Sequence, residues 1–202
     1  MQVLTIYSGS INERHLTQAV EELRAGNIVI YPTDTVYALG CDALNQRAIE
    51  RLCRIKGLNP DKNRLSIVCA DLSQASEYAR IDNTAYRIIK DYLPGPYTFV
   101  LPASTRLPKV FKGRKTVGVR VPDNDIARAL AAELGNPILT SSVAIDDDED
   151  ICVAEAVAMH YDGAASLTID GGRCSAVPST VVDLTEASGP EVLRQGAGEF
   201  IL

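Results

Sequence analysis

The strongest constraint on the fold is the alternation of short apolar runs with segments of helical periodicity. Apolar runs that predict buried strands lie at residues 27–32, 64–70, 97–101, 116–122, 137–142, 179–184 and 191–196. Between many of them, apolar residues recur at intervals of three and four, as on one face of a helix. This alternation favours α/β layers over a sandwich or a helix bundle, with ligands bound where loops leave the strand ends.

Six helices are predicted between or beside these strands. Their expected positions are a helix capped by Asn12 and ended by Gly26, helices over 44–55, 72–79 and 84–92, a helix capped by Asp123 that reaches Leu134, and a helix over 151–161. The apolar residues expected to face the core include Leu16, Val20 and Leu44. Asn and Asp are good caps because their side chains accept hydrogen bonds from free amides of the first turn.

Length and composition predict one soluble domain over residues 1–202. A hydrophobic content of 46% is enough for a substantial core. The start "MQVLTIY" lacks a basic leader, and no run approaches the roughly 18 apolar residues of a membrane span, so a cytoplasmic protein with no membrane partner is expected. The net charge of −6 does not indicate nucleic-acid binding by the whole molecule, although six basic and no acidic residues occupy 106–120. That stretch is either a solvated face or a contact for an anionic partner.

Three apolar runs end or begin in hydroxyl groups, at Thr33 to Thr35, Thr140 to Ser142 and Ser179 to Thr180. Hydroxyls suit a polar substrate because each donates and accepts, although caps and turns use them as well. Arg120 lies inside an apolar strand, where burial requires either an anionic ligand or an internal Asp or Glu partner. These features predict a polar, partly cationic pocket.

Several kinds of site are excluded or disfavoured. No P-loop, Rossmann glycine motif or G-x-S-x-G elbow is present. The chain has only two histidines, so a catalytic Ser-His or Cys-His pair is not expected. The five widely spaced cysteines form no C-x-x-C pair, so they are expected as reduced core residues and no metal site is predicted from them.

A series of motifs resembles the YrdC family. "YPTDTVYALGCDA", "IKG", "LPGPYTFVL", "VGVRVP", "LTSS", "PSTVVDL" and "LRQGA" follow in the family's order and approximate spacing, from Ile28 to Ala197. The resemblance implies a twisted, mixed open sheet flanked by helices around a central cationic cavity. It also implies synthesis of threonylcarbamoyl-adenylate from L-threonine, bicarbonate and ATP with Mg²⁺, a step in the formation of threonylcarbamoyl-adenosine in tRNA.

The resemblance also implies roles for residues at matching positions. Catalytic roles fall to Lys56, Arg120 and Ser141; threonine-binding roles fall to Thr33, Tyr37 and Thr180; and nucleotide-binding roles fall to Lys62, Ser66 and Arg194. Arg64 is a further nucleotide-binding candidate, because the segment between Lys62 and Ser66 is one residue longer than the family pattern.

Two positions depart from the family's K-x-R and S-x-N elements. Leu58 stands in place of the arginine and Val143 in place of the asparagine. Leucine offers none of the bidentate contacts of an arginine, and Arg64 is the candidate replacement for the lost guanidinium. The same departures resemble the YciO branch, so the alternative is a non-synthase paralogue that binds nucleotide, tRNA or double-stranded RNA, or hydrolyses a threonylcarbamoyl compound.

Overall fold

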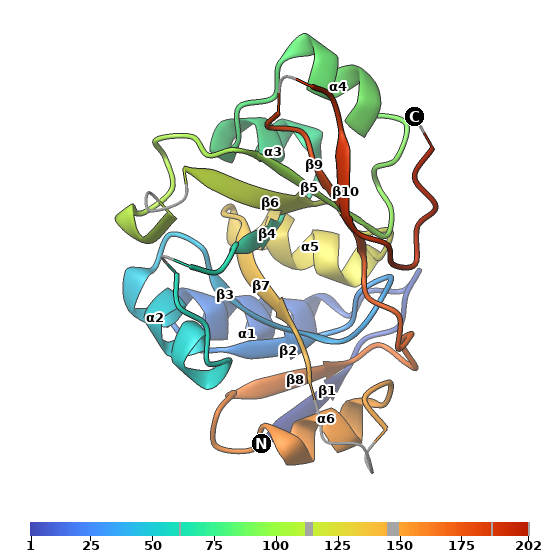
Figure 1. The fold of residues 1–202 in the computed structure, drawn as a ribbon. Coiled ribbons are helices and arrows are strands. Elements are labelled where there is room, and N and C mark those ends of the chain that lie inside the picture. The colour runs from blue at the N-terminus through green and yellow to red at the C-terminus, as the bar shows by residue number, and fades with distance from the viewer. Residues whose placement is uncertain (61, 112–114, 145–149, 187, 202) are drawn as a thin grey trace.

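One mixed sheet of ten strands organises the computed structural model, which describes residues 1–60, 62–111, 115–144, 150–186 and 188–201 (Figure 1). The strands are β1 (Gln2–Thr5), β2 (Val29–Tyr31), β3 (Ala38–Asp42), β4 (Ser66–Val68), β5 (Tyr97–Pro102), β6 (Thr116–Arg120), β7 (Ile138–Ser142), β8 (Leu167–Asp170), β9 (Thr180–Asp183) and β10 (Glu191–Arg194). They are hydrogen-bonded in the order β1-β8-β2-β3-β7-β4-β6-β5-β9-β10. Parallel and antiparallel pairs both occur, for example β4 with β6 and β4 with β7, which confirms the predicted mixed α/β sheet.

Six α-helices and one short 3₁₀ helix are described. They are α1 (Glu13–Arg24), α2 (Gln46–Ile55), α3 (Leu72–Tyr78), α4 (Asn83–Ile89), η1 (Lys109–Phe111), α5 (Asp125–Leu134) and α6 (Ala154–His160). No helix in the described part of the chain is long and apolar enough to cross a membrane.

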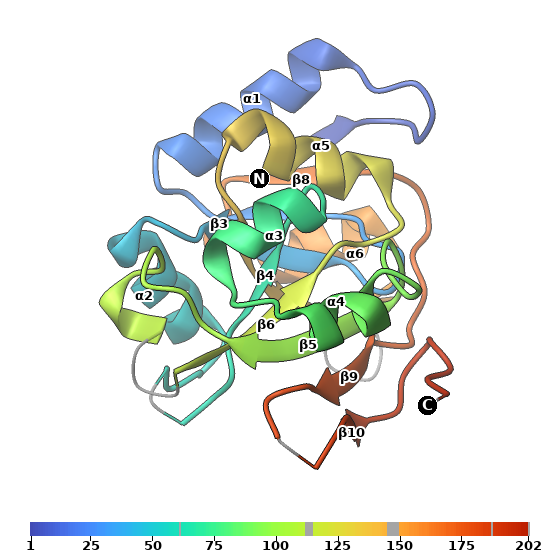
Figure 2. The same cartoon turned by 90° about the horizontal axis from the view of Figure 1, so that it is seen from above.

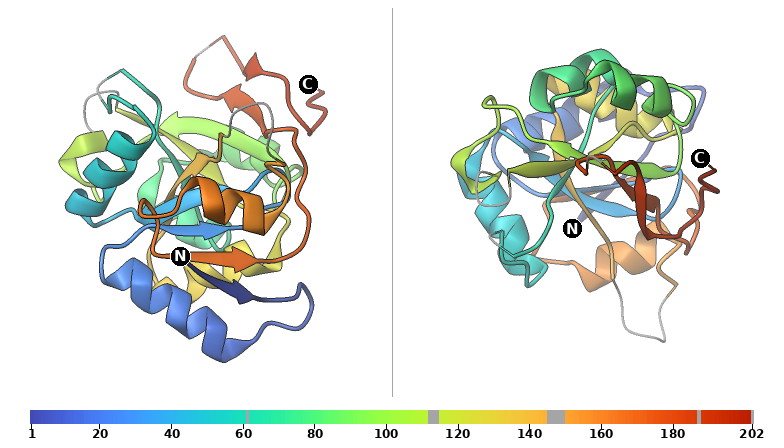
Figure 3. Two further views of the ribbon diagram at one scale, coloured as in Figure 1. Left: turned by 90° about the horizontal axis from the view of Figure 1, so that it is seen from below. Right: turned by 45° about the horizontal axis from the view of Figure 1, so that its top comes forward.

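The helices bury two apolar clusters against the sheet. One cluster joins α1 and α5 to β2 and β8 through residues such as Val20 and Leu130, and the two helices lie side by side in Figure 2. The other collects buried residues of α2, α3, α4 and α6, among them Leu52 and Val157. Figure 3 shows α6 and α1 on opposite sides of the strands at the end of the sheet that contains β1 and β8. Burial of both sheet faces explains why several strands are apolar throughout rather than alternating.

All six predicted helices and all seven predicted strands are present, with shifted ends. Two details were wrong. The helix at 125–134 is capped by Asn124, whose side chain accepts from the Ala127 amide, and not by Asp123. Leu44 precedes α2 and is 37% exposed, so it is not a core residue. Strands β1, β3 and β8 were not predicted, although residues 166–170 alternate polar and apolar side chains before two glycines.

Candidate functional site

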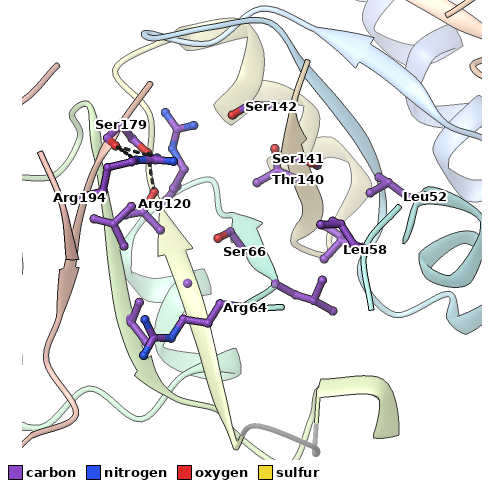
Figure 4. Close-up of a pocket in the computed structure, with 16 residues that line it drawn as sticks. Leu52, Leu58, Arg64, Ser66, Arg120, Thr140, Ser141, Ser142, Ser179 and Arg194 are labelled. Carbon is purple, nitrogen blue, oxygen red and sulfur yellow. Dashed lines mark hydrogen bonds between the residues drawn. The ribbon is translucent and has the colours of Figure 1, made fainter. Parts of the chain in front are cut away.

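A polar pocket lies over the middle of the sheet, with a volume of about 240 Å³ (Figure 4). Strand register explains its floor, because Thr140, Ser66, Gly118 and Val100 pair in sequence across β7, β4, β6 and β5. A Cβ on Gly118 would approach the Ser66 hydroxyl oxygen to 2.4 Å, so glycine keeps this part of the floor open. The lining comprises Leu52, Leu58, Arg64, Leu65, Ser66, Thr98, Val100, Gly118, Arg120, Leu139, Thr140, Ser141, Ser142, Ser179, Val181 and Arg194.

Arg120, at the end of β6, forms part of the cationic wall of this pocket. It is 4% exposed, and its Nη2 donates to Asp34 Oδ1 at 2.8 Å and to Thr35 Oγ1 at 3.1 Å. The internal-carboxylate alternative for Arg120 is therefore confirmed, since Asp34 is its ion-pair partner. Its Nε is nevertheless buried without a hydrogen-bond partner among the residues that the structure describes. An unsatisfied buried donor is costly, so an acceptor that reached this atom would be stabilising.

Arg194 of β10 lies beside Arg120 and completes the cationic wall (Figure 4). Its Nε and Nη2 donate to the Ser179 carbonyl oxygen at 3.1 and 2.8 Å. Burial, and then the positive charge of Arg120, lower the pKa of Arg194. In the described part of the chain Arg194 has no carboxylate partner, and Asp34 pairs with Arg120 alone. The excess positive charge favours an anionic ligand.

Hydroxyl groups occupy the middle of the pocket. Thr98 and Ser179 hydrogen-bond each other at 2.8 Å, and Thr140 accepts from the Tyr31 hydroxyl at 2.9 Å. Within the described residues, the hydroxyls of Ser66, Ser141 and Ser142 have no hydrogen-bond partner, so they are available to a ligand.

An apolar wall faces the arginines and includes Leu52, Leu58, Leu65 and Leu139 (Figure 4). Leu58 is placed by the end of α2, where Gly57 has a φ of +61° and the Leu58 amide donates to the Cys53 carbonyl at 2.8 Å. This is a Schellman C-cap, in which the residue after the glycine turns back onto the helix. A leucine at 58 therefore both closes α2 and makes this side of the pocket apolar.

Arg64 also lines the pocket, but it has a carboxylate partner. Its Nη2 lies 3.2 Å from Asp183 Oδ2, and the Arg64 side chain is 41% exposed. Asp183 is buried and also accepts from the amide and hydroxyl of Thr185 at 2.9 and 2.6 Å. Replacement of the lost guanidinium by Arg64 stays a prediction, and a ligand anion would compete with Asp183 for this side chain.

Five of the ten predicted site residues are absent from this lining. Lys56, the C-cap of α2, donates to the Tyr161 hydroxyl at 3.3 Å, and Lys62 is exposed. Thr33 donates to the Val36 carbonyl and accepts from the Thr35 amide and hydroxyl, which uses its full capacity.

Tyr37 and Thr180 are also engaged within the protein. Tyr37 donates to the Gly172 carbonyl at 2.6 Å, and burial raises the pKa of Tyr37. The hydroxyl of Thr180 donates to the Gly198 carbonyl and accepts from the Gly196 amide. Direct contact of Thr33, Tyr37 and Thr180 with threonine stays a prediction, and for the two threonines it requires these bonds to rearrange.

Several lining or supporting residues were not assigned roles from sequence. Asp34, Thr35 and Ser179 were visible only as members of hydroxyl clusters, and Thr98 and Asp183 gave no separate signal. The need of a buried Arg120 for a carboxylate was the one signal that pointed to Asp34.

The basic stretch at 106–120 contributes only Arg120 to the described lining. Arg106 pairs with Glu77, Lys109 begins η1, and Lys115 is exposed. Lys112 and Arg114 lie outside the described residues. An RNA contact by this stretch stays a prediction.

The arrangement suits binding and charge stabilisation more than nucleophilic attack by a protein side chain. Burial raises the pKa of the Cys41 and Cys69 thiols, which disfavours reactive thiolates. Among described residues, no group of three His, Cys, Asp or Glu side chains could hold a metal ion. The carboxylates nearest the pocket, Asp34 and Asp183, are already paired with arginines, so they do not fit direct Mg²⁺ ligation.

Comparison with known proteins gives a consistent result. The family model Sua5_yciO_yrdC, described as "Telomere recombination", matches residues 21–196. The chain is 38% identical to the threonylcarbamoyl-AMP synthase of Pyrococcus abyssi over 92% of this chain and 55% of that protein. The crystal structure of E. coli YciO has a TM-score of 0.90 at 39% identity, covering 98% of this chain and 97% of that one. The structure of P. abyssi Sua5 complexed with L-threonine has a TM-score of 0.87 at 36% identity, covering 97% and 58%.

Proposed function

The chain belongs to the Sua5/YciO/YrdC family, and on that premise we propose that its pocket binds a nucleotide together with threonine or a threonine-derived group. The observation that carries the proposal is the wall formed by Arg120 and Arg194, where, among the described residues, only Arg120 has a carboxylate partner and its buried Nε lacks an acceptor. The unpaired hydroxyls of Ser66 and Ser141 beside this wall would contact further phosphate or carboxylate oxygens.

The reaction that we propose first is formation of threonylcarbamoyl-adenylate. The threonine nitrogen bonds to the carbon of bicarbonate, one C–O bond breaks and water is released, which gives N-carboxythreonine. A carboxylate oxygen of that product attacks the α-phosphorus of ATP, and the bond to the leaving pyrophosphate breaks. The substrate thus supplies the nucleophile, and the protein would position the reactants and stabilise phosphate charge. Magnesium would enter with the phosphates of ATP and need not have a protein carboxylate of its own.

A second candidate is a non-synthase activity in the same pathway. The apolar wall at Leu58 and the engagement of Arg64 by Asp183 both reduce the positive charge offered to a triphosphate. On this proposal the pocket binds a nucleotide or RNA, or hydrolyses a threonylcarbamoyl compound. The cytoplasm is the expected site of action under either proposal.

Pyrophosphate release from ATP tests the first proposal. Release should require both threonine and bicarbonate, and Arg194→Gln should reduce it by about tenfold or more, since a charge-assisted contact is lost. Arg54→Gln, on the exposed side of α2, is the matched control and should leave the rate unchanged. Release no faster than without protein would reject the synthase, and salt-sensitive RNA binding would then favour the second candidate.

The variant Leu58→Arg, measured in the same assay, tests whether the residue at position 58 limits synthase activity. If the missing guanidinium limits the reaction, this variant should release pyrophosphate on the order of a hundredfold faster than the parent chain. An unchanged rate would show that position 58 is not the main difference from the synthases.

A further inference from the structure

Asp34 connects two strand ends behind the cationic wall. Its Oδ1 accepts from Arg120 Nη2 at 2.8 Å and its Oδ2 accepts from the Asp123 amide at 2.9 Å. The Asp34 side chain is 8% exposed, and it does not itself line the pocket. One carboxylate therefore neutralises a buried arginine and fixes the backbone directly after β6.

Thr35 extends this support with hydrogen bonds of defined direction. Thr33 donates to the Val36 carbonyl at 2.7 Å, so in the 3.0 Å contact between the two hydroxyls Thr35 is the donor. The Thr35 oxygen is then an acceptor for Arg120 Nη2. The donors run from Arg120 to Thr35 to Thr33 and end at a backbone carbonyl, so no hydroxyl in the chain can reverse without losing a bond.

These bonds occupy Arg120 Nη2 alone. Its two hydrogens are accounted for by Asp34 and Thr35, while Nε is buried and unpaired. A guanidinium fixed through one terminal nitrogen keeps its remaining donors in a set direction, because the group is planar. Arg194, which has no carboxylate partner in the described residues, stands beside it.

We propose that Asp34 and Thr35 are positioning residues that hold Arg120 so that its remaining donors meet the anionic group of the ligand. The proposal rests on the proposed function for the identity of that ligand, a nucleotide. Positioning means that binding should weaken when the support is lost, although neither supporting side chain touches the ligand. In the protein without ligand, the guanidinium of Arg120 should also become more mobile when the support is lost.

Thr35→Val tests the proposal with the least disturbance, since it removes the hydroxyl and keeps the side-chain shape. ATP binding in the presence of Mg²⁺ is measured by calorimetry, and the order of the Arg120 Nε–H group by ¹⁵N relaxation, with the signal assigned through Arg120→Lys. Thr35→Val should weaken ATP binding about tenfold and lower the Nε order. Thr35→Ser should restore both. Thr168→Val, at a buried threonine of β8 outside the pocket lining, is the matched control and should change neither.

Asp34→Asn is the second variant, because it keeps an acceptor for Arg120 but removes the charge. It should weaken ATP binding further than Thr35→Val. Wild-type ATP affinity and wild-type Nε order in Thr35→Val would overturn the proposal. If the parent chain itself fails to bind ATP, the proposed function is wrong. The ¹⁵N order parameter of the Arg120 Nε–H group then tests positioning by itself. A lower order parameter in Thr35→Val supports positioning, and an unchanged one rejects it.

Discussion

The two residues that depart from the family pattern occupy different environments. Leu58 lines the pocket, so a polar replacement there would reach open space. Val143 is 5% exposed within an apolar cluster, and its amide donates to the Tyr37 carbonyl at 2.9 Å. Position 58 therefore faces the pocket, whereas position 143 contributes to packing.

Val143→Asn should lower the free energy of unfolding by about 1–3 kcal/mol, because it places an amide among apolar side chains. Urea unfolding at neutral pH measures the change. Val181→Asn is the matched control, since Val181 is half-buried and lines the pocket, where water can solvate the new amide. Equal losses in the two variants would contradict the distinction drawn between these sites.

At the scale of the elements, side-chain caps determine where most helices begin. Asn12, Asn45, Asp71, Asp82 and Asn124 each accept a hydrogen bond from the amide three residues further on. Such a cap satisfies an amide that the helix leaves without a partner.

The cap of α5 gives a prediction for two neighbouring residues. Asn124→Ala should lower the free energy of unfolding by about 1 kcal/mol through loss of the bond to the Ala127 amide. Asp123→Ala should cost less than about 0.5 kcal/mol, since within the described residues its side chain forms only an exposed ion pair with Arg128 at 3.4 Å. Thermal and urea unfolding of both variants check the order, and a larger loss for Asp123→Ala would contradict the assigned cap.

The helices could be predicted from sequence because their signals are local. Apolar periodicity with the Asn12 cap located α1, and apolar periodicity alone located α2, to within a few residues. Strands β1 and β8 were missed, and each pairs with the other across most of the chain. Pairing over such a distance leaves little local signal.

The site could be predicted only in part for the same reason. The motif resemblance located Ser66, Arg120, Ser141 and Arg194, which the fold brings together. The sequence did not reveal that Asp183 pairs with Arg64 or that Thr33 is fully hydrogen-bonded, because both facts depend on partners placed by the fold.

For the whole molecule, buried phenols and thiols determine the response to alkali. Burial raises the pKa of Tyr31 to about 12 and also raises the pKa values of Tyr37, Cys41 and Cys69. The unfolded chain loses these protons first, near the ordinary values of 9.0 for thiols and 10.0 for phenols. The contribution to stability is therefore complete below those values and is lost as the pH rises toward the folded pKa.

The free energy of unfolding should consequently fall above pH 9 and more steeply above pH 10. Tyr31 alone should account for about 1 kcal/mol per pH unit between pH 10 and its folded pKa. Urea unfolding under reducing conditions from pH 7 to pH 11 measures the loss, which Tyr31→Phe should reduce. Stability that stays constant up to pH 11 would contradict the burial of these groups.

The pairing of β1 with β8 has a consequence for synthesis of the protein. Residues 2–5 leave the ribosome long before their partners at 167–170, because more than 160 residues separate the two strands. Until β8 has been synthesised, the hydrogen-bonding groups of β1 lack their strand partner, a state that favours aggregation during slow translation. The helix that follows, α1, is local and can form while β1 waits, and its cap at Asn12 lets it begin without the sheet.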